Sequence, residues 1–381
     1  MAVTSPGEAQ VTDTSGPGSI DGRNRLANLK RLVSSAEGFC YWLVVAPLAA
    51  LLPARLAYRV ACWRGDWIRR HWTEKRLEVV FNLRELLGDE FSPEETERLT
   101  RDFFRHLSCE VIDVMRLRGR ARSLGKLVEI RGREHLDAAL AGGKGAILCS
   151  AHFGSHISVS SLLHTGGYPL TTIGRWYWKY EDGYTAAERK FWEFVYARRV
   201  LRHRQRPNIE PWPGRLQVAA QAAAALRGNE LVTICSDAEP LESDRPRAVE
   251  VPFMGRPAML MPGVVTLARL TGAPVLMAFT HRTADYRHQV LEISAPVSMQ
   301  GDTATAFGRC VAAIETEIRT RPANWFYWYS SDDLATMGLL PSVPAAEASA
   351  VSPEPVVGVP AALLEDGRSA PRHHHVPRGP Q

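Results

Sequence analysis

Short apolar runs alternate with helix-like segments through the middle of the chain. The runs are continuous rather than alternating with polar positions, and glycine, proline or charged residues bound them. Strands are predicted at residues 126–130, 145–150, 231–235, 274–279 and 289–293, and helices between them at residues 133–141, 216–226 and 263–270. Because continuous apolar strands are typical of sheets covered on both faces, we predict an α/β fold with a mostly parallel central sheet flanked by helices.

The segment before these strands is predicted to be helical. Residues 55–87 are mostly helix-forming, and Ser92-Pro93-Glu94-Glu95 starts a further helix that continues through residues 103–114. Serine is a favourable N-cap, proline suits the first helical position, and the acidic residues interact with the positive end of the helix dipole.

An uncharged stretch from Gly38 to Ala54 bears on membrane contact. It has 17 residues, slightly fewer than the roughly 20 that a bilayer-spanning helix needs, and it contains Pro47 and Pro53. Tryptophan and arginine then interleave along residues 55–72, which suits a lipid headgroup interface. Two interpretations remain open: a segment that spans the membrane or lies in its interface, and a helix buried in the protein core.

Composition divides the chain into four parts. Residues 1–24 are polar and rich in glycine and serine, and residues 339–381 are rich in proline, alanine and valine without periodicity. Both are predicted to be disordered. Between them we place an N-terminal membrane-associated helical segment at 25–90 and the α/β domain at 91–338.

Charge and cysteine content narrow the classes of function. The 381 residues carry a net charge of +5, with neither zinc-finger spacing nor a dense basic tail, so no nucleic-acid partner is expected. This mild excess suits an anionic membrane face or an acidic substrate. None of the six cysteines forms a C-x-x-C pair, which argues for reduced thiols and against a disulfide framework or a metal site.

Two candidate catalytic side chains follow predicted strands. His152 comes directly after the strand 145–150, and Asp237 occupies the same place after the strand 231–235. If the strands are parallel neighbours, both side chains reach one cleft, where the carboxylate orients a histidine that acts as general base. The alternative is a packing or capping role for each. Gly154 would let the backbone approach a bound group, and Glu239 lies close behind Asp237.

Arg175 is a candidate anion-binding residue, and two motifs of other enzyme classes are absent. Arg175 follows a strand-and-turn pattern at 171–174 and suits a phosphate or polar head group. A basic cluster at 198–206 fits either such a site or a solvated helix face. We find neither a G-x-S-x-G nucleophile elbow nor a phosphate-binding G-x-x-x-x-G-K-[ST] loop.

Six blocks of sequence, in order, resemble the bacterial lipid A biosynthesis (lauroyl/myristoyl) acyltransferases. The matching blocks are 143–154 with the segment Ala151-His152-Phe153-Gly154, Arg175, 231–237, 250–258, 262–275 and 318–325. The likeness covers roughly residues 40 to 330. It implies a glycerolipid acyltransferase-like α/β fold and no metal or cofactor. The implied donor is an acyl carrier protein or acyl-CoA, the acceptor a hydroxyl of a membrane (glyco)lipid, and the location the cytoplasmic face of the inner membrane.

One position departs from the family pattern of histidine, four residues, then an acid. The acidic position is Ile157, and an aliphatic side chain cannot orient an imidazole. Three outcomes are open: Asp237 supports His152 alone, His156 replaces the missing group, or catalysis is lost and lipid or partner binding remains. Acyl transfer to a non-lipid acceptor is a further alternative.

Overall fold

A six-stranded sheet forms the centre of the fold in a computed structural model that describes residues 40–155, 163, 166–174, 190, 209, 215–240 and 244–341. The strands are β1 (Val128–Arg131), β2 (Ala146–Ser150), β3 (Leu170–Thr172), β4 (Leu231–Cys235), β7 (Val275–Arg282) and β8 (Gln289–Val297). Their order is β1-β8-β7-β2-β4-β3. The four strands from β7 to β3 are parallel, whereas β7 and β8 are antiparallel. The predicted α/β class with a mostly parallel sheet is confirmed.

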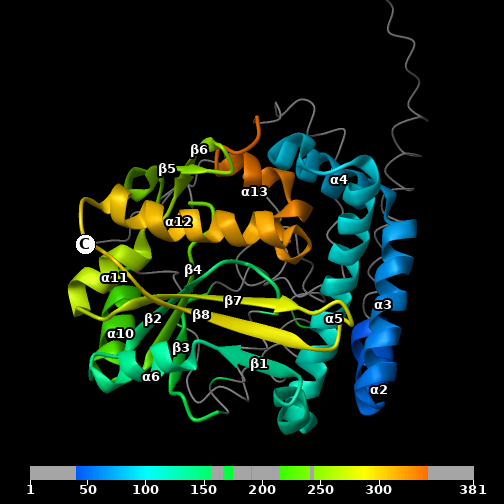
Figure 1. Ribbon diagram of the computed structural model, residues 1–381, viewed down its shortest axis with the longest axis horizontal. Coiled ribbons are helices and arrows are strands. Elements are labelled where there is room, and N and C mark those ends of the chain that lie inside the picture. Colours follow the sequence, from blue (N-terminus) through cyan, green and yellow to red (C-terminus); the bar gives the residue numbers. More distant parts are fainter. Residues whose placement is uncertain are drawn as a thin grey trace, which may run out of the picture.

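Helices cover both faces of the sheet (Figure 1). They are α6 (Arg133–Ala141), α10 (Arg215–Arg227), α11 (Gly263–Thr271) and α12 (Thr303–Thr320). One buried cluster joins the β2 side chains Ile147 and Cys149 to α10, α11 and α12, and the other joins Ala146 and Leu148 to α6. Since successive side chains of a strand point to opposite faces, α6 covers the face opposite the other three helices.

An antiparallel hairpin that was not predicted from the sequence lies beside α12. Its strands are β5 (Val249–Phe253) and β6 (Arg256–Leu260), joined by Met254 and Gly255. Both turn residues have positive φ, 52° and 73°. Such two-residue turns usually carry Asn-Gly or Asp-Gly, so Met254-Gly255 is a weak sequence signal.

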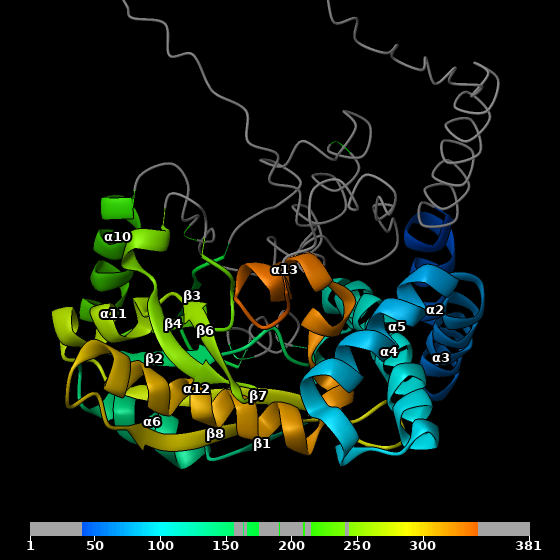
Figure 2. The ribbon, with the colours of Figure 1, turned by 90° about the horizontal axis from the view of Figure 1, so that it is seen from above.

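The N-terminal helices stack at the end of the sheet toward which β7 points (Figures 1 and 2). They are α2 (Ala46–Leu51), α3 (Ala54–His71), α4 (Thr73–Leu87) and α5 (Pro93–Gly125). As predicted, α5 begins after Ser92. The Ser92 hydroxyl accepts from the Glu95 backbone amide, and the Glu95 carboxylate accepts from that of Ser92.

The described part of the stretch Gly38–Ala54 packs one side against the protein and leaves the other exposed, and both sides are apolar. A π-helical turn at Tyr41–Val45 leads into α2, and Trp42 and Ala46 are buried, whereas Leu48 and Leu51 are exposed. Within the described residues, no helix is both long enough and apolar enough to span a bilayer.

The C-terminal part of the domain returns across the strand ends. Two 3₁₀ turns, Pro322–Asn324 and Phe326–Tyr329, follow α12, and α13 (Ser331–Thr336) comes next. Further 3₁₀ turns lie at Gly88–Glu90 and Arg245–Arg247. Leu339 and Leu340, which were predicted to begin the C-terminal tail, are buried in the core.

Candidate active site

His152 and Asp237 lie in contact at the ends of adjacent parallel strands. Ser150 pairs with Cys235 at the ends of β2 and β4, and each functional residue stands two positions further on. His152 Nδ1 is 2.9 Å from Asp237 Oδ1, and the His152 backbone amide donates to Oδ2 at 2.8 Å. The strand register therefore brings together two residues that are 85 positions apart in the chain.

The Asp237 carboxylate is fully buried and stabilised in its charged form. Burial alone raises its pKa, but the His152 ring and hydrogen bonds from His152 and Trp325 outweigh burial, so the pKa lies below its usual value. Trp325 Nε1 donates to Oδ2 at 2.9 Å. Because a carboxylate only accepts hydrogen bonds, the Nδ1 of His152 carries the proton and the neutral ring keeps a lone pair on Nε2.

The segment after α12 fixes the loop that carries His152. The His152 carbonyl accepts from the Phe326 amide at 3.0 Å, and the Gly154 amide donates to the Asn324 carbonyl at 2.8 Å. Phe153 and Trp325 form an isolated antiparallel bridge between these hydrogen bonds. Backbone contacts therefore hold His152 on both sides.

Close packing of the backbone explains Gly154. Its φ is +55°, and a Cβ there would lie 1.9 Å from the carbonyl oxygen of Thr280 in β7. Substrate approach was the expected reason for this glycine; packing against β7 suffices to require it. The Gly154 amide itself donates to the Asn324 carbonyl and so helps to hold the loop.

The remaining predicted site residues fall into two groups. Glu239 accepts a hydrogen bond from the Tyr327 hydroxyl at 3.2 Å, and the Tyr327 ring meets the His152 ring edge to face at 5.3 Å. Glu239 therefore belongs to the surroundings of His152. The others, His156, Ile157, Arg175 and the basic cluster 198–206, lie outside the described residues.

Trp325 and Tyr327 are contacts of the site that reasoning from single residues did not find. Trp325 belongs to the closing block of the family resemblance, so a signal for it existed. Tyr327 follows two residues later, on the same returning segment. Nothing in the local sequence indicates that this segment crosses the ends of β2 and β4.

Two clusters among the described residues have the composition of metal sites. His152, Cys235 and Asp237 form one, but both Asp237 oxygens already accept hydrogen bonds from protein donors, which fits a histidine–carboxylate pair better than a metal. The other contains His281, Glu292 and Glu317. Arg321 forms ion pairs with both of its carboxylates and already supplies the compensating charge.

Comparison with known proteins agrees with this architecture. The sequence profile of the family described as bacterial lipid A biosynthesis acyltransferase matches residues 27–330. Phosphatidylinositol mannoside acyltransferases of two Mycobacterium tuberculosis strains are 29% identical over 240 and 211 residues, covering 61% and 54% of this chain and 66% and 59% of theirs. A lipid A biosynthesis acyltransferase of Haemophilus influenzae is 22% identical over 289 residues, 74% of this chain and 82% of that protein.

The chain thus spans less than two thirds of the length of the mycobacterial relatives. The family profile, by contrast, runs from the N-terminal helices through the sheet to the returning segment that holds His152. This chain belongs to the bacterial lipid A biosynthesis acyltransferase family.

Proposed function

We propose that this protein transfers a fatty acyl group from a thioester to a hydroxyl of a membrane (glyco)lipid, with His152 as the general base. The observation that carries the proposal is the contact between His152 Nδ1 and the buried Asp237 carboxylate. It gives the imidazole a fixed tautomer and a neighbour that stabilises its protonated form.

The proposed chemistry proceeds in two halves. His152 Nε2 takes the proton of the acceptor hydroxyl as its oxygen attacks the thioester carbonyl, and Asp237 stabilises the imidazolium that forms. The tetrahedral intermediate then collapses, the carbon–sulfur bond breaks, and the imidazolium returns the proton to the thiolate. The ester is the product, and His152 is again neutral.

The relatives' names support a proposal for the acceptor, and the family resemblance supports one for the donor. The names of the similar proteins specify acylation of phosphatidylinositol mannosides and acyl transfer in lipid A biosynthesis. We therefore propose a lipid acceptor with a sugar-containing head group, and an acyl carrier protein or acyl-CoA as donor. Arg175 would hold a phosphate of the head group.

We also propose that the N-terminal helices rest on the cytoplasmic face of the inner membrane. Large apolar side chains gather on them with about half of their surface exposed: Leu43, Val44, Leu48, Leu51, Leu56, Trp63, Leu77 and Phe81. Arg55 and Arg59, also exposed, lie among these positions in the sequence. Exposed leucine and tryptophan beside arginine suit the boundary between acyl chains and anionic head groups.

The central test is His152→Ala in purified protein, with a radiolabelled acyl thioester and lipid acceptors in mixed micelles. Transfer should disappear while the protein remains folded. His288→Ala is the matched control, because His288 also bonds a carboxylate through Nδ1, that of Asp285 at 2.7 Å, but on an exposed turn. If the wild-type protein is active and His152→Ala is equally active, His152 is not the base.

A second candidate function is lipid or partner binding without catalysis, which Ile157 at the motif's acidic position favours. An inactive wild-type protein that binds glycolipid vesicles would support it. Ile157→Glu separates the two candidates further: a large gain of transfer indicates an impaired site, and loss of an existing activity indicates a site rebuilt around Ile157.

A further inference from the structure

A buried ionic cluster lies directly behind the His152 loop. Asp113, in the middle of α5, forms an ion pair with Arg282 at the end of β7, and both side chains are almost fully buried. The Ser155 hydroxyl donates to Asp113 Oδ2 at 2.8 Å and accepts from Arg282 Nη2. Gln289 of β8 and Tyr58 of α3 also donate to Asp113. The cluster therefore joins two N-terminal helices, the sheet and the His152 loop.

The cluster is a costly arrangement for stability alone. Removing two charges from water costs several kcal/mol per ion, and apolar side chains of similar volume often stabilise a core equally well. Asp113 and Arg282 offset this cost only because their hydrogen-bonding groups are satisfied by partners. One of these partners, Ser155, lies three residues after His152 in the same loop.

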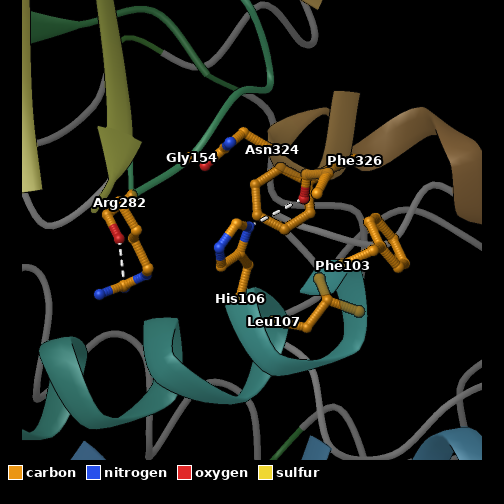
Figure 3. A pocket seen from close by; sticks show the side chains of 9 residues that line it. Phe103, His106, Leu107, Gly154, Arg282, Asn324 and Phe326 are labelled. Atoms are coloured by element: carbon orange, nitrogen blue, oxygen red, sulfur yellow. Dashed lines mark hydrogen bonds between the residues drawn. The ribbon is translucent and has the colours of Figure 1, made fainter. Parts of the chain in front are cut away.

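Helix α5 holds the loop by a second route as well (Figure 3). His106, two turns before Asp113, has its Nδ1 3.0 Å from the Ala323 carbonyl. Burial and the nearby Arg282 guanidinium lower the pKa of His106 to about 4, so the neutral ring donates this hydrogen bond. Ala323 precedes Asn324, whose carbonyl accepts from Gly154.

The pocket drawn in Figure 3 lies between α5 and this loop, and Ser155 and Arg282 help to line it. Its enclosed volume is about 10 Å³, roughly what a single water molecule needs. The pocket is therefore too small for a separate ligand, and it marks where α5 supports the His152 loop.

We propose that Ser155, held between Asp113 and Arg282, is a positioning residue that sets the place of His152 relative to the acyl thioester. This proposal rests on the proposed acyl transfer. Asp237, which Trp325 holds by a hydrogen bond, fixes the imidazole, and Ser155 fixes the other end of the same short loop. With both ends anchored, His152 keeps its geometry while substrate binds.

The test compares Ser155→Ala with Ser155→Thr and with the control Ser108→Ala. Ser108 lies on α5 and, like Ser155, is buried with a hydroxyl that accepts a hydrogen bond from an arginine, here Arg64. Among the described residues, the hydrogen bonds that Ser108 makes outside α5 join it to Arg64 and Tyr41 and not to the His152 loop. Losing a hydrogen bond to a charged pair should lower the kcat of Ser155→Ala by about 10- to 100-fold. KM for the thioester should stay within about threefold, because the change acts on the base and not on binding.

Two further variants distinguish positioning of His152 from a general structural role. Ser155→Thr keeps the hydroxyl and should recover most of the lost kcat, and Ser108→Ala should retain wild-type kcat. If Ser155→Ala keeps kcat within about twofold of the active wild type, or if Ser155→Thr falls as far, the positioning role is wrong. Activities are compared well below the melting temperature of each variant.

If the wild-type protein transfers no acyl group, the proposed function is wrong. A spectroscopic measurement still tests the positioning role in that case. Selective ¹⁵N labelling of histidine reports the Nδ1 proton that His152 shares with Asp237, identified by its absence in His152→Ala. Ser155→Ala should shift or broaden this resonance, and Ser108→Ala should leave it in place. An unchanged resonance in Ser155→Ala would overturn the proposal.

Discussion

Replacing the Asp237 carboxylate by its amide, Asp237→Asn, tests the proposed chemistry with little change of shape. Asp237 is fully buried, and three donors surround it: the Nδ1 and backbone N of His152 and the Nε1 of Trp325, at 2.8–2.9 Å. Two of these donors point at Oδ2, so the amide oxygen of asparagine should take that position. The amide nitrogen then faces His152 Nδ1.

An amide nitrogen can only donate, so this arrangement forces the neutral imidazole to carry its proton on Nε2. In that tautomer the ring cannot accept the proton of the acceptor hydroxyl. In a serine protease, replacing the corresponding aspartate by asparagine leaves the geometry intact and lowers kcat by about 10⁴-fold. By analogy, we expect a loss of the same order here, equivalent to about 5 kcal/mol of transition-state stabilisation.

The assay is acyl transfer from thioester to lipid, measured together with thermal unfolding. Asp237→Asn keeps the two hydrogen bonds to Oδ2 and reverses the third, so the protein should remain folded. Glu239→Gln is the matched control, since it makes the same isosteric change two residues further on, where the carboxylate accepts from Tyr327. A folded Asp237→Asn variant with more than about a tenth of wild-type kcat would refute the tautomer argument.

Three further outcomes follow from the structure. Gly154→Ala should abolish activity and destabilise the fold far more than Gly143→Ala, as thermal melts of the two variants would show. Gly143 also has a positive φ, +71°, but open space around it, so alanine there carries only the left-handed backbone penalty of about 1–2 kcal/mol. Trp325→Phe keeps the ring but removes a donor to Asp237, so kcat should fall about tenfold while the fold persists. The pKa of His106 is about 4 in the folded protein and about 6.5 in the unfolded chain, so between these pH values only the unfolded chain binds the proton. The free energy of unfolding should therefore fall by as much as about 3 kcal/mol from pH 6.5 to pH 4. Denaturant titrations should show that His106→Gln reduces this dependence on pH.

The sequence contained enough information for the sheet and for the contact between His152 and Asp237. Continuous apolar runs predicted the strands, and residues that follow parallel strands meet at one edge of the sheet. The catalytic roles of the two residues remain predictions. The antiparallel direction of β8 was also foreseeable, since the predicted strands 274–279 and 289–293 are too close in the chain for a helical crossover.

The ionic cluster behind the loop was not foreseeable from one sequence. Asp113 lies in the middle of a long amphipathic helix, where an acidic residue usually faces solvent. Arg282 ends a strand that was predicted to end at Phe279, and Ser155 has no distinctive neighbours. Only the packing of α5 across the end of the sheet brings these three side chains together, and this tertiary arrangement has no local signature.

The strands β2 and β4 end at residues that pair with each other, Ser150 and Cys235, and this has an evolutionary consequence. His152 and Asp237 each stand two residues beyond paired strand ends, so their meeting depends on register and not on the length of chain between them. Insertions and deletions between the two strands leave the pair aligned. A single residue gained or lost inside β2 or β4 shifts one partner by about 3.3 Å along its strand and separates them. The meeting of the pair therefore sets no requirement on the length of the chain that joins the two strands.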